Sequence, residues 1–167
     1  MAISKPFNLQ KWIKENKELL QPPVSNKNLY VESEDYIVMI VGGPNARKDY
    51  HYNETEELFY QLEGEITVYI QEDGKKKAMK LSAGDMYLHP AKVPHSPART
   101  AGSVGLVIER KRAGKGFNDG LLWFCDNSII NYTKSISNYT TLKKTFFHIL
   151  VRSTIRKKKE HVKNVVL

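Results

Sequence analysis

Short apolar or alternating segments recur along the chain from Tyr30 onward, and they constrain the fold more than any other feature. They lie at 36–41, 58–62, 66–70, 106–109 and 121–124. Runs of about four to eight such residues between turn residues are typical of β-strands. The turns are spaced so closely that the strands must be antiparallel. The sequence therefore predicts a mostly β sandwich or small barrel, and a closed barrel leaves room for one small ligand.

One hairpin and one strand face are marked clearly. Asp73-Gly74 is a residue pair that favours a two-residue hairpin turn. In the preceding segment 65–71, alternate residues face opposite ways. One face holds Ile66, Val68 and Ile70, and the other holds Thr67, Tyr69 and Gln71. We expect the apolar face to be buried.

A short amphipathic helix is predicted ahead of the strands, over residues 8–20. Its apolar face consists of Leu9, Trp12, Ile13 and Leu20. Asn8 stands where a helix N-cap is expected, and Pro22-Pro23 marks the end. This is the one helix that the pattern predicts with defined ends.

The chain has 167 residues and a net charge of +8, and the excess charge lies in one place. Residues 1–127 hold 17 Lys and Arg against 17 Asp and Glu, whereas 128–167 hold 9 basic residues against Glu160 alone. We expect one globular domain over 1–127 and a separate basic segment over 128–167. The neutral body argues against a nucleic-acid-binding protein, and the RKKK run at 156–159 lacks interleaved aromatic residues.

Cysteine content and hydropathy exclude further classes. Cys125 is the only cysteine, so neither an intrachain disulfide nor a four-thiolate zinc site can form. No apolar run is long enough to span a membrane, and the first residues lack the pattern of a secretory signal. We expect a cytoplasmic protein without membrane contact.

Three residues stand out as candidate metal ligands: His51, Glu57 and His95. Two imidazoles and one carboxylate on one face of a metal favour Fe(II) and leave positions open for substrate and O₂. A turn after Asn53 would bring His51 and Glu57 onto neighbouring strands that face one cavity. Any one of the three taken alone would be an ordinary surface residue, so the prediction depends on all three meeting.

Three further charged residues fit the same cavity. Arg47 lies four residues before His51 and Arg99 four residues after His95, so both are candidates to hold a substrate carboxylate. Glu109 ends an apolar strand, where an acid is costly unless it faces a polar cavity. The alternative is that the two arginines form surface ion pairs and that Glu109 only marks a strand end.

The spacing resembles the two motifs of the cupin superfamily. His51-x-Asn53-x₃-Glu57-x₆-Gly64 resembles the first, with Asn53 where many cupins have a second histidine. Gly84-x₅-Pro90-x₄-His95 resembles the second, with Lys92 at a position that is usually glycine. Nearby residues of ligand type lie off these motifs, namely Glu54, Glu56 and His89. The resemblance implies a cupin-type double-stranded β-helix, a jelly-roll barrel with a short N-terminal helix.

Longer segments resemble one enzyme family, 3-hydroxyanthranilate 3,4-dioxygenase, over residues 6–127. They include VMIVGGPNARKDYH, EELFYQLEG, HPAKVPHSPAR, VGLVIER and DGLLWFCDN. The resemblance implies that His51, Glu57 and His95 bind Fe(II). It further implies that Arg47, Arg99 and Glu109 are catalytic and bind substrate, and that Asn26 lies near the substrate.

The resemblance also implies a reaction and its partners. An extradiol dioxygenase of this family converts 3-hydroxyanthranilate and O₂ to 2-amino-3-carboxymuconate semialdehyde, the precursor of quinolinate in NAD biosynthesis through the kynurenine pathway. The expected partners are that substrate and O₂, with a homodimer as one candidate assembly. Two alternatives stay open: a cupin that binds a small carboxylate without redox chemistry, and an inactive homologue whose basic segment binds an acidic partner.

One departure from the family concerns its second iron site. Bacterial and fungal members continue with two CxxC pairs that bind an iron away from the active site. Here the first pair reads Cys125-Asp126-Asn127-Ser128, and no later cysteine follows. The second site cannot form, but every expected catalytic group precedes it. We therefore expect activity to be retained, with stability or dimerisation more at risk.

Overall fold

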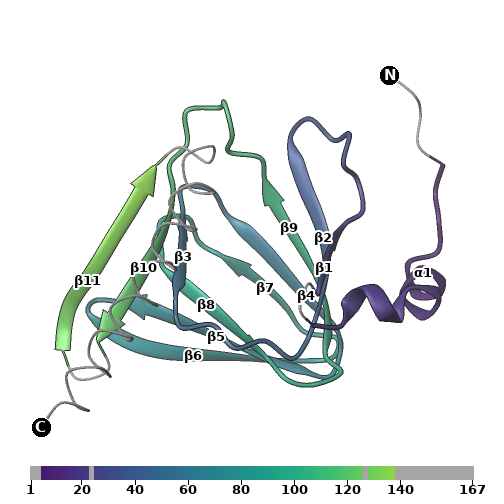
Figure 1. The fold of residues 1–167 in the computed structure, drawn as a ribbon, viewed down its shortest axis with the longest axis horizontal. Coiled ribbons are helices and arrows are strands. Elements are labelled where there is room, and N and C mark those ends of the chain that lie inside the picture. Colours follow the sequence, from purple (N-terminus) through teal and green to yellow (C-terminus); the bar gives the residue numbers. More distant parts are fainter. Residues whose placement is uncertain (1–4, 23–24, 126–127, 138–167) are drawn as a thin grey trace, which may run out of the picture.

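Two antiparallel sheets face each other and enclose the interior of the protein (Figure 1). The computed structural model describes residues 5–22, 25–125 and 128–137. The five-stranded sheet has the order β1-β2-β9-β4-β7, and the six-stranded sheet has the order β11-β10-β3-β8-β5-β6. The strands are β1 (Asn26–Asn28), β2 (Tyr36–Gly42), β3 (Tyr50–Asn53), β4 (Glu57–Glu63), β5 (Glu65–Glu72), β6 (Lys75–Ser82), β7 (Met86–His89), β8 (His95–Arg99), β9 (Val104–Arg110), β10 (Asp119–Cys125) and β11 (Ser128–Ser137). The predicted fold class, mostly β with a short N-terminal helix, is confirmed.

The main apolar core lies between the two sheets. Its buried members are Phe59, Ile66, Val68, Ile70, Leu81 and Val107. The three β5 residues among them are those predicted to share one buried face, which the burial pattern of the strand confirms. This core occupies one part of the interior. Because its side chains are closely packed, the strands that carry the polar side chains of the remaining part are held in place.

The β5–β6 hairpin turns at Asp73-Gly74, as predicted. Both residues have positive φ, 51° and 70°, as a two-residue type I′ turn requires. β6 forms the outer edge of its sheet, and seven of its eight residues are exposed, among them Lys75, Lys76, Lys77 and Lys80. Charged lysines on an edge strand hinder pairing with other chains.

The predicted N-terminal helix is present but divides into two parts. α1 (Leu9–Glu15) begins at Asn8, whose side chain accepts a hydrogen bond from the Lys11 N–H at 2.8 Å. At Asn16 the chain leaves the α-helix and continues as the 3₁₀ helix η1 (Lys17–Leu20). The backbone of Asn16 leaves helical geometry, and its side-chain amide donates to the Trp12 carbonyl at 2.8 Å beside its own N–H at 3.0 Å.

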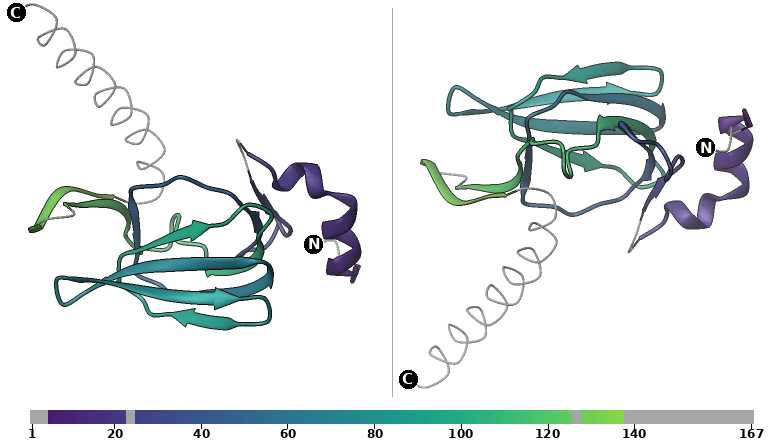
Figure 2. Two further views of the ribbon diagram at one scale, coloured as in Figure 1. Left: turned by 90° about the horizontal axis from the view of Figure 1, so that it is seen from below. Right: turned by 90° about the horizontal axis from the view of Figure 1, so that it is seen from above.

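A second, smaller core holds the two helices beside the five-stranded sheet, as Figures 1 and 2 show. It consists of Ile13, Leu20, Ile40 and Val104. Gly42 at the end of β2 permits this close approach. A Cβ at that position would lie 2.1 Å from the Leu20 carbonyl oxygen.

The first part of the basic segment joins the barrel. β11 pairs with β10 as the last strand of the six-stranded sheet, with register shifts on either side of Phe124. The domain boundary at residue 127 stays a prediction, and residues 138–167 lie outside the described part of the chain. No helix among the described residues is long and apolar enough to cross a membrane.

His89 is a fully buried histidine of β7 with a structural environment. Its Nε2 lies 2.8 Å from the Val93 carbonyl oxygen, and its Nδ1 lies 3.1 Å from the Tyr87 hydroxyl. Both ring nitrogens therefore have partners. Burial, together with the positive charge that His95 can carry, lowers the pKa of His89 to about 4.

We predict that Ile66→Ala lowers the free energy of unfolding by about 2–5 kcal/mol, because it removes buried methylenes and leaves a cavity. Chemical denaturation checks this. Met79→Ala on β6 is the matched control, since Met79 is 37% exposed whereas Ile66 is 2% exposed. Equal losses in the two variants would contradict the assignment of the core.

We also predict that the metal-free protein loses stability as the pH falls from 6.5 towards 4. In this window the unfolded chain binds a proton at His89, whose ordinary pKa is 6.5, while the folded chain does not. His89→Gln removes this difference, so its free energy of unfolding should depend less steeply on pH. Urea titrations at several pH values measure both slopes, and parallel slopes would refute the prediction.

Candidate metal centre

The three predicted ligands come from both sheets and meet between them. His51 lies on β3 and His95 on β8, and the two residues are direct partners across these neighbouring strands. Glu57 is the first residue of β4, in the opposite sheet. The expectation of neighbouring strands for His51 and Glu57 is wrong, because the chain crosses from one sheet to the other between β3 and β4. The carboxylate therefore faces the two imidazoles across the interior.

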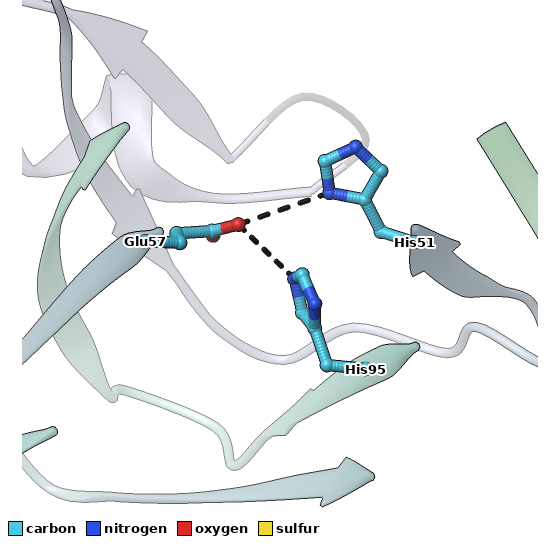
Figure 3. A group of neighbouring side chains, drawn as sticks. All are labelled: His51, Glu57 and His95. Carbon is cyan, nitrogen blue, oxygen red and sulfur yellow. Dashed lines mark ion pairs between the residues drawn. The ribbon is translucent and has the colours of Figure 1, made fainter. Parts of the chain in front are cut away.

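The ligand atoms of these residues converge on one point, as Figure 3 shows. Glu57 Oε2 lies 3.1 Å from His95 Nε2 and 3.8 Å from His51 Nδ1. All three ligand atoms lie within 4.8 Å of one another. His95 and Glu57 are buried, and the His51 side chain is 19% exposed. The sequence prediction that the three residues form one cluster is confirmed.

Electrostatics favour an ionised carboxylate at this position. Burial alone would raise the pKa of Glu57, but His95, and to a smaller extent His51 and Arg112, outweigh it and lower the pKa to about 2. Burial lowers the pKa of His95 and so favours the neutral imidazole that a metal requires. Near neutral pH the site thus has a negative oxygen at Glu57 and a neutral nitrogen donor at His95.

Asn53 contacts the candidate ligand Glu57 directly. Its side-chain amide donates a hydrogen bond to Glu57 Oε2 at 3.2 Å. Asn53 is the residue that stands where many cupins have a second histidine. An amide at this position orients the carboxylate by a neutral hydrogen bond, which leaves three strong donors in the cluster rather than four.

Two further residues of the site were missed by sequence reasoning: Asp119 and Arg112. Asp119 Oδ1 lies 2.7 Å from His51 Nε2, and Asp119 Oδ2 accepts a hydrogen bond from Arg112 Nε at 2.5 Å. Contact with Asp119 outweighs the effect of burial and raises the pKa of His51. The available signal was Asp119 at the start of an apolar strand, where a carboxylate needs a partner.

The two predicted clamp arginines differ in their surroundings. Arg99 is buried on β8, and its Nη1 has no hydrogen-bond partner among the described residues. Burial lowers its pKa to about 10. Gly105 makes room for it, because a Cβ there would lie 3.0 Å from Arg99 Nη1. Arg47 is more exposed and forms an ion pair with Asp49.

Glu109 is buried beside the cluster, whereas Asn26 lies at the sheet edge. Glu109 is the cross-strand partner of Glu57, and burial raises its pKa. Its Oε2 accepts a hydrogen bond from Arg112 Nη1 at 2.9 Å. Asn26 is an exposed residue of β1, opposite Val41. Its predicted place near a substrate stays a prediction.

The donor set fits a divalent metal ion. Two imidazole nitrogens and one carboxylate oxygen on one side of a common point match the facial arrangement of non-haem Fe(II) proteins. The partners of the ligands are also those expected around a metal: a carboxylate on one imidazole and an amide on the carboxylate. His51, Glu57 and His95 are therefore a candidate metal site.

The chain is similar in sequence to curated proteins that share one enzyme name. It is 52% identical over 120 residues to the 3-hydroxyanthranilate 3,4-dioxygenase of Xanthomonas campestris pv. campestris, and 53% identical over 121 residues to that of Bacillus thuringiensis. Each alignment covers 72% of this chain and 66% of the relative. The chain thus matches just under two thirds of the length of these relatives.

A solved structure and a family profile complete the comparison. The chain resembles a Neisseria meningitidis protein of known structure with a TM-score of 0.50 and 19% identity, over 64% of this chain and 100% of that one. The profile of the 3-hydroxyanthranilic acid dioxygenase family matches residues 1–152, well past residue 127. The match includes the cluster of His51, Glu57 and His95, and the chain belongs to the 3-hydroxyanthranilic acid dioxygenase family.

Proposed function

We propose that this protein is an Fe(II)-dependent extradiol dioxygenase that opens the ring of 3-hydroxyanthranilate with O₂. The product would be 2-amino-3-carboxymuconate semialdehyde, which places the enzyme in quinolinate and NAD biosynthesis through the kynurenine pathway. The observation that carries the proposal is the meeting of His51, Glu57 and His95 inside a barrel of this family. We further propose that it works in the cytoplasm as a homodimer.

Iron would be held by His51, Glu57 and His95, and it would supply a template for substrate and O₂ and a path for electrons between them. This donor set leaves open positions on one side of the metal. An aromatic ring with neighbouring amino and hydroxyl groups can chelate through both. The walls of both sheets limit the orientations that the ring can take.

Arg99 is suited to bind the substrate carboxylate. Its buried guanidinium has an unpartnered nitrogen, and a buried donor gains most from a charged acceptor. Gly105 has no side chain and so leaves space for the Arg99 guanidinium beside the strand. Arg47 would add a second cation at the carboxylate once its ion pair with Asp49 opens.

Glu109 is suited to accept the substrate hydroxyl proton. Its buried carboxyl group has a raised pKa, so it binds a proton more readily than an exposed glutamate does. Arg112 holds Oε2 of this group, which leaves the other oxygen to receive the proton. Asn26 would contact the substrate from β1.

We predict that Glu57→Ala abolishes iron binding and lowers ring cleavage by more than about 100-fold, because even the loss of a residue behind a metal ligand costs 10–100-fold. His51→Ala should act alike. Metal analysis and the loss of substrate absorbance with Fe(II) measure both effects. The control is Glu56→Ala, which removes the exposed neighbouring carboxylate. Full turnover by Glu57→Ala would disprove the metal site, and no turnover by iron-loaded parent protein would disprove the activity.

We predict that Arg99→Met lowers kcat/KM for 3-hydroxyanthranilate by about 10- to 150-fold, the effect of one lost hydrogen bond to a charged group of about 1.5–3 kcal/mol. It should leave kcat/KM for 2-aminophenol, which lacks the carboxylate, within about threefold. Steady-state O₂ uptake with the two substrates checks this, with Arg110→Met as the control. Equal losses for both substrates would contradict a role in carboxylate binding.

A further inference from the structure

Arg112 is a buried cation to which the proposed chemistry gives no contact with metal or substrate. It lies between β9 and β10, and only 3% of its surface is exposed. Its guanidinium makes three hydrogen bonds to residues that the structure describes. Nε donates to Asp119 Oδ2 at 2.5 Å, and Nη1 donates to Glu109 Oε2 at 2.9 Å and to the Arg110 carbonyl at 3.0 Å. A buried charge needs such partners to offset its desolvation.

These contacts form a continuous chain from a metal ligand to the proton acceptor. At one end, Asp119 Oδ1 contacts His51 Nε2 at 2.7 Å. At the other end, Glu109 takes its only side-chain hydrogen bond among the described residues from Arg112. Asp119 is the first residue of β10, and Glu109 is the last but one of β9. The backbone of a strand does not fix the side-chain torsion angles of either carboxylate.

We propose that Arg112 is a positioning residue that fixes the His51 ring and the Glu109 carboxylate relative to each other. Through Asp119 it sets the rotation of the imidazole so that Nδ1 faces Glu57. Through Nη1 it turns one oxygen of Glu109 away from the reaction. Only the second part rests on the proposed function, because metal binding by His51 does not depend on which substrate is used.

The geometry requires an arginine rather than any cation. The guanidinium is a planar fork with donors at fixed angles, and here two different nitrogens hold the two carboxylates. A lysine ammonium is a single point at the end of a flexible chain. It can satisfy the charge of the pair, but it cannot hold both carboxylates in fixed orientations at once.

The test compares Arg112→Met, Arg112→Lys and Asp119→Asn with the parent. Arg110→Met is the matched control, since Arg110 lies on the same segment and its side chain is exposed. The first readout is the affinity for Co(II) without substrate or O₂, from competition with a chelator, together with the visible absorption band of bound Co(II). Circular dichroism and thermal unfolding establish that each variant is folded.

We expect Arg112→Met and Asp119→Asn each to weaken Co(II) binding by about 10-fold or more and to shift the Co(II) band. The double variant should lose no more than the worse single variant, since both changes break one chain of contacts. Arg112→Lys should recover less than half of the lost affinity on a logarithmic scale. Folded variants with parental affinity and band, or losses that add in the double variant, would overturn the proposal.

The second readout is the kinetics of the iron-loaded enzyme with 3-hydroxyanthranilate. Arg112 does not touch the substrate in this arrangement, so Arg112→Lys should lower kcat by about 10-fold and change KM by less than about twofold. A rise in KM alone would overturn the positioning role towards Glu109. Should Arg112→Met fail to fold, Arg112→Lys and Asp119→Asn decide the matter. A parent that binds Co(II) but lacks turnover refutes the proposed function and leaves the Co(II) comparison valid.

Discussion

The polar interior is organised around one buried carboxylate, that of Glu57, which lies between two imidazoles from the opposite sheet. A buried negative charge is costly unless positive or hydrogen-bonding groups surround it. His95, His51 and Asn53 surround the Glu57 carboxylate, and Asn53 donates a hydrogen bond to it. His95, and to a smaller extent His51 and Arg112, hold the pKa of Glu57 at about 2 despite its burial. Because these partners come from β3 and β8 while Glu57 comes from β4, the electrostatics of the site require both sheets to be in place.

The polar interior extends beyond the candidate ligands, and one cation contacts two of its carboxylates. Glu109 and Asp119 are both buried, and both are held by Arg112. The arrangement gives two similar carboxylates opposite pKa shifts: burial raises that of Glu109, whereas His51 and Arg112 outweigh burial at Asp119 and lower it. One carboxylate is thereby suited to take up a proton and the other to stay charged against an imidazole. The apolar core between the sheets keeps these groups in place, since close-packed side chains leave little freedom for the strands to shift.

Local features of the chain were predictable, and those that depend on strand placement were not. The turn at Asp73-Gly74, the buried face of β5 and the cap at Asn8 follow from rules that involve only a few neighbouring residues. The break of the helix at Asn16 is also local, but apolar periodicity continues to Leu20 and does not register a change of backbone geometry. The assignment of β3 and β4 to different sheets was missed, because alternation indicates which face of a strand is buried and not which sheet the strand joins.

The sequence by itself determined the family, the mostly β fold and the identity of the three candidate ligands, since motif spacing and apolar alternation are properties of the chain read in one dimension. The tertiary structure decided which groups stand behind those ligands. Asp119 is 68 residues from His51 and Arg112 stands in a run of basic residues, so neither is marked by its neighbours in the sequence. Their role arises only when β10 pairs with β3 and the interior excludes water. A carboxylate and a guanidinium removed from solvent are stable only when they are paired with each other.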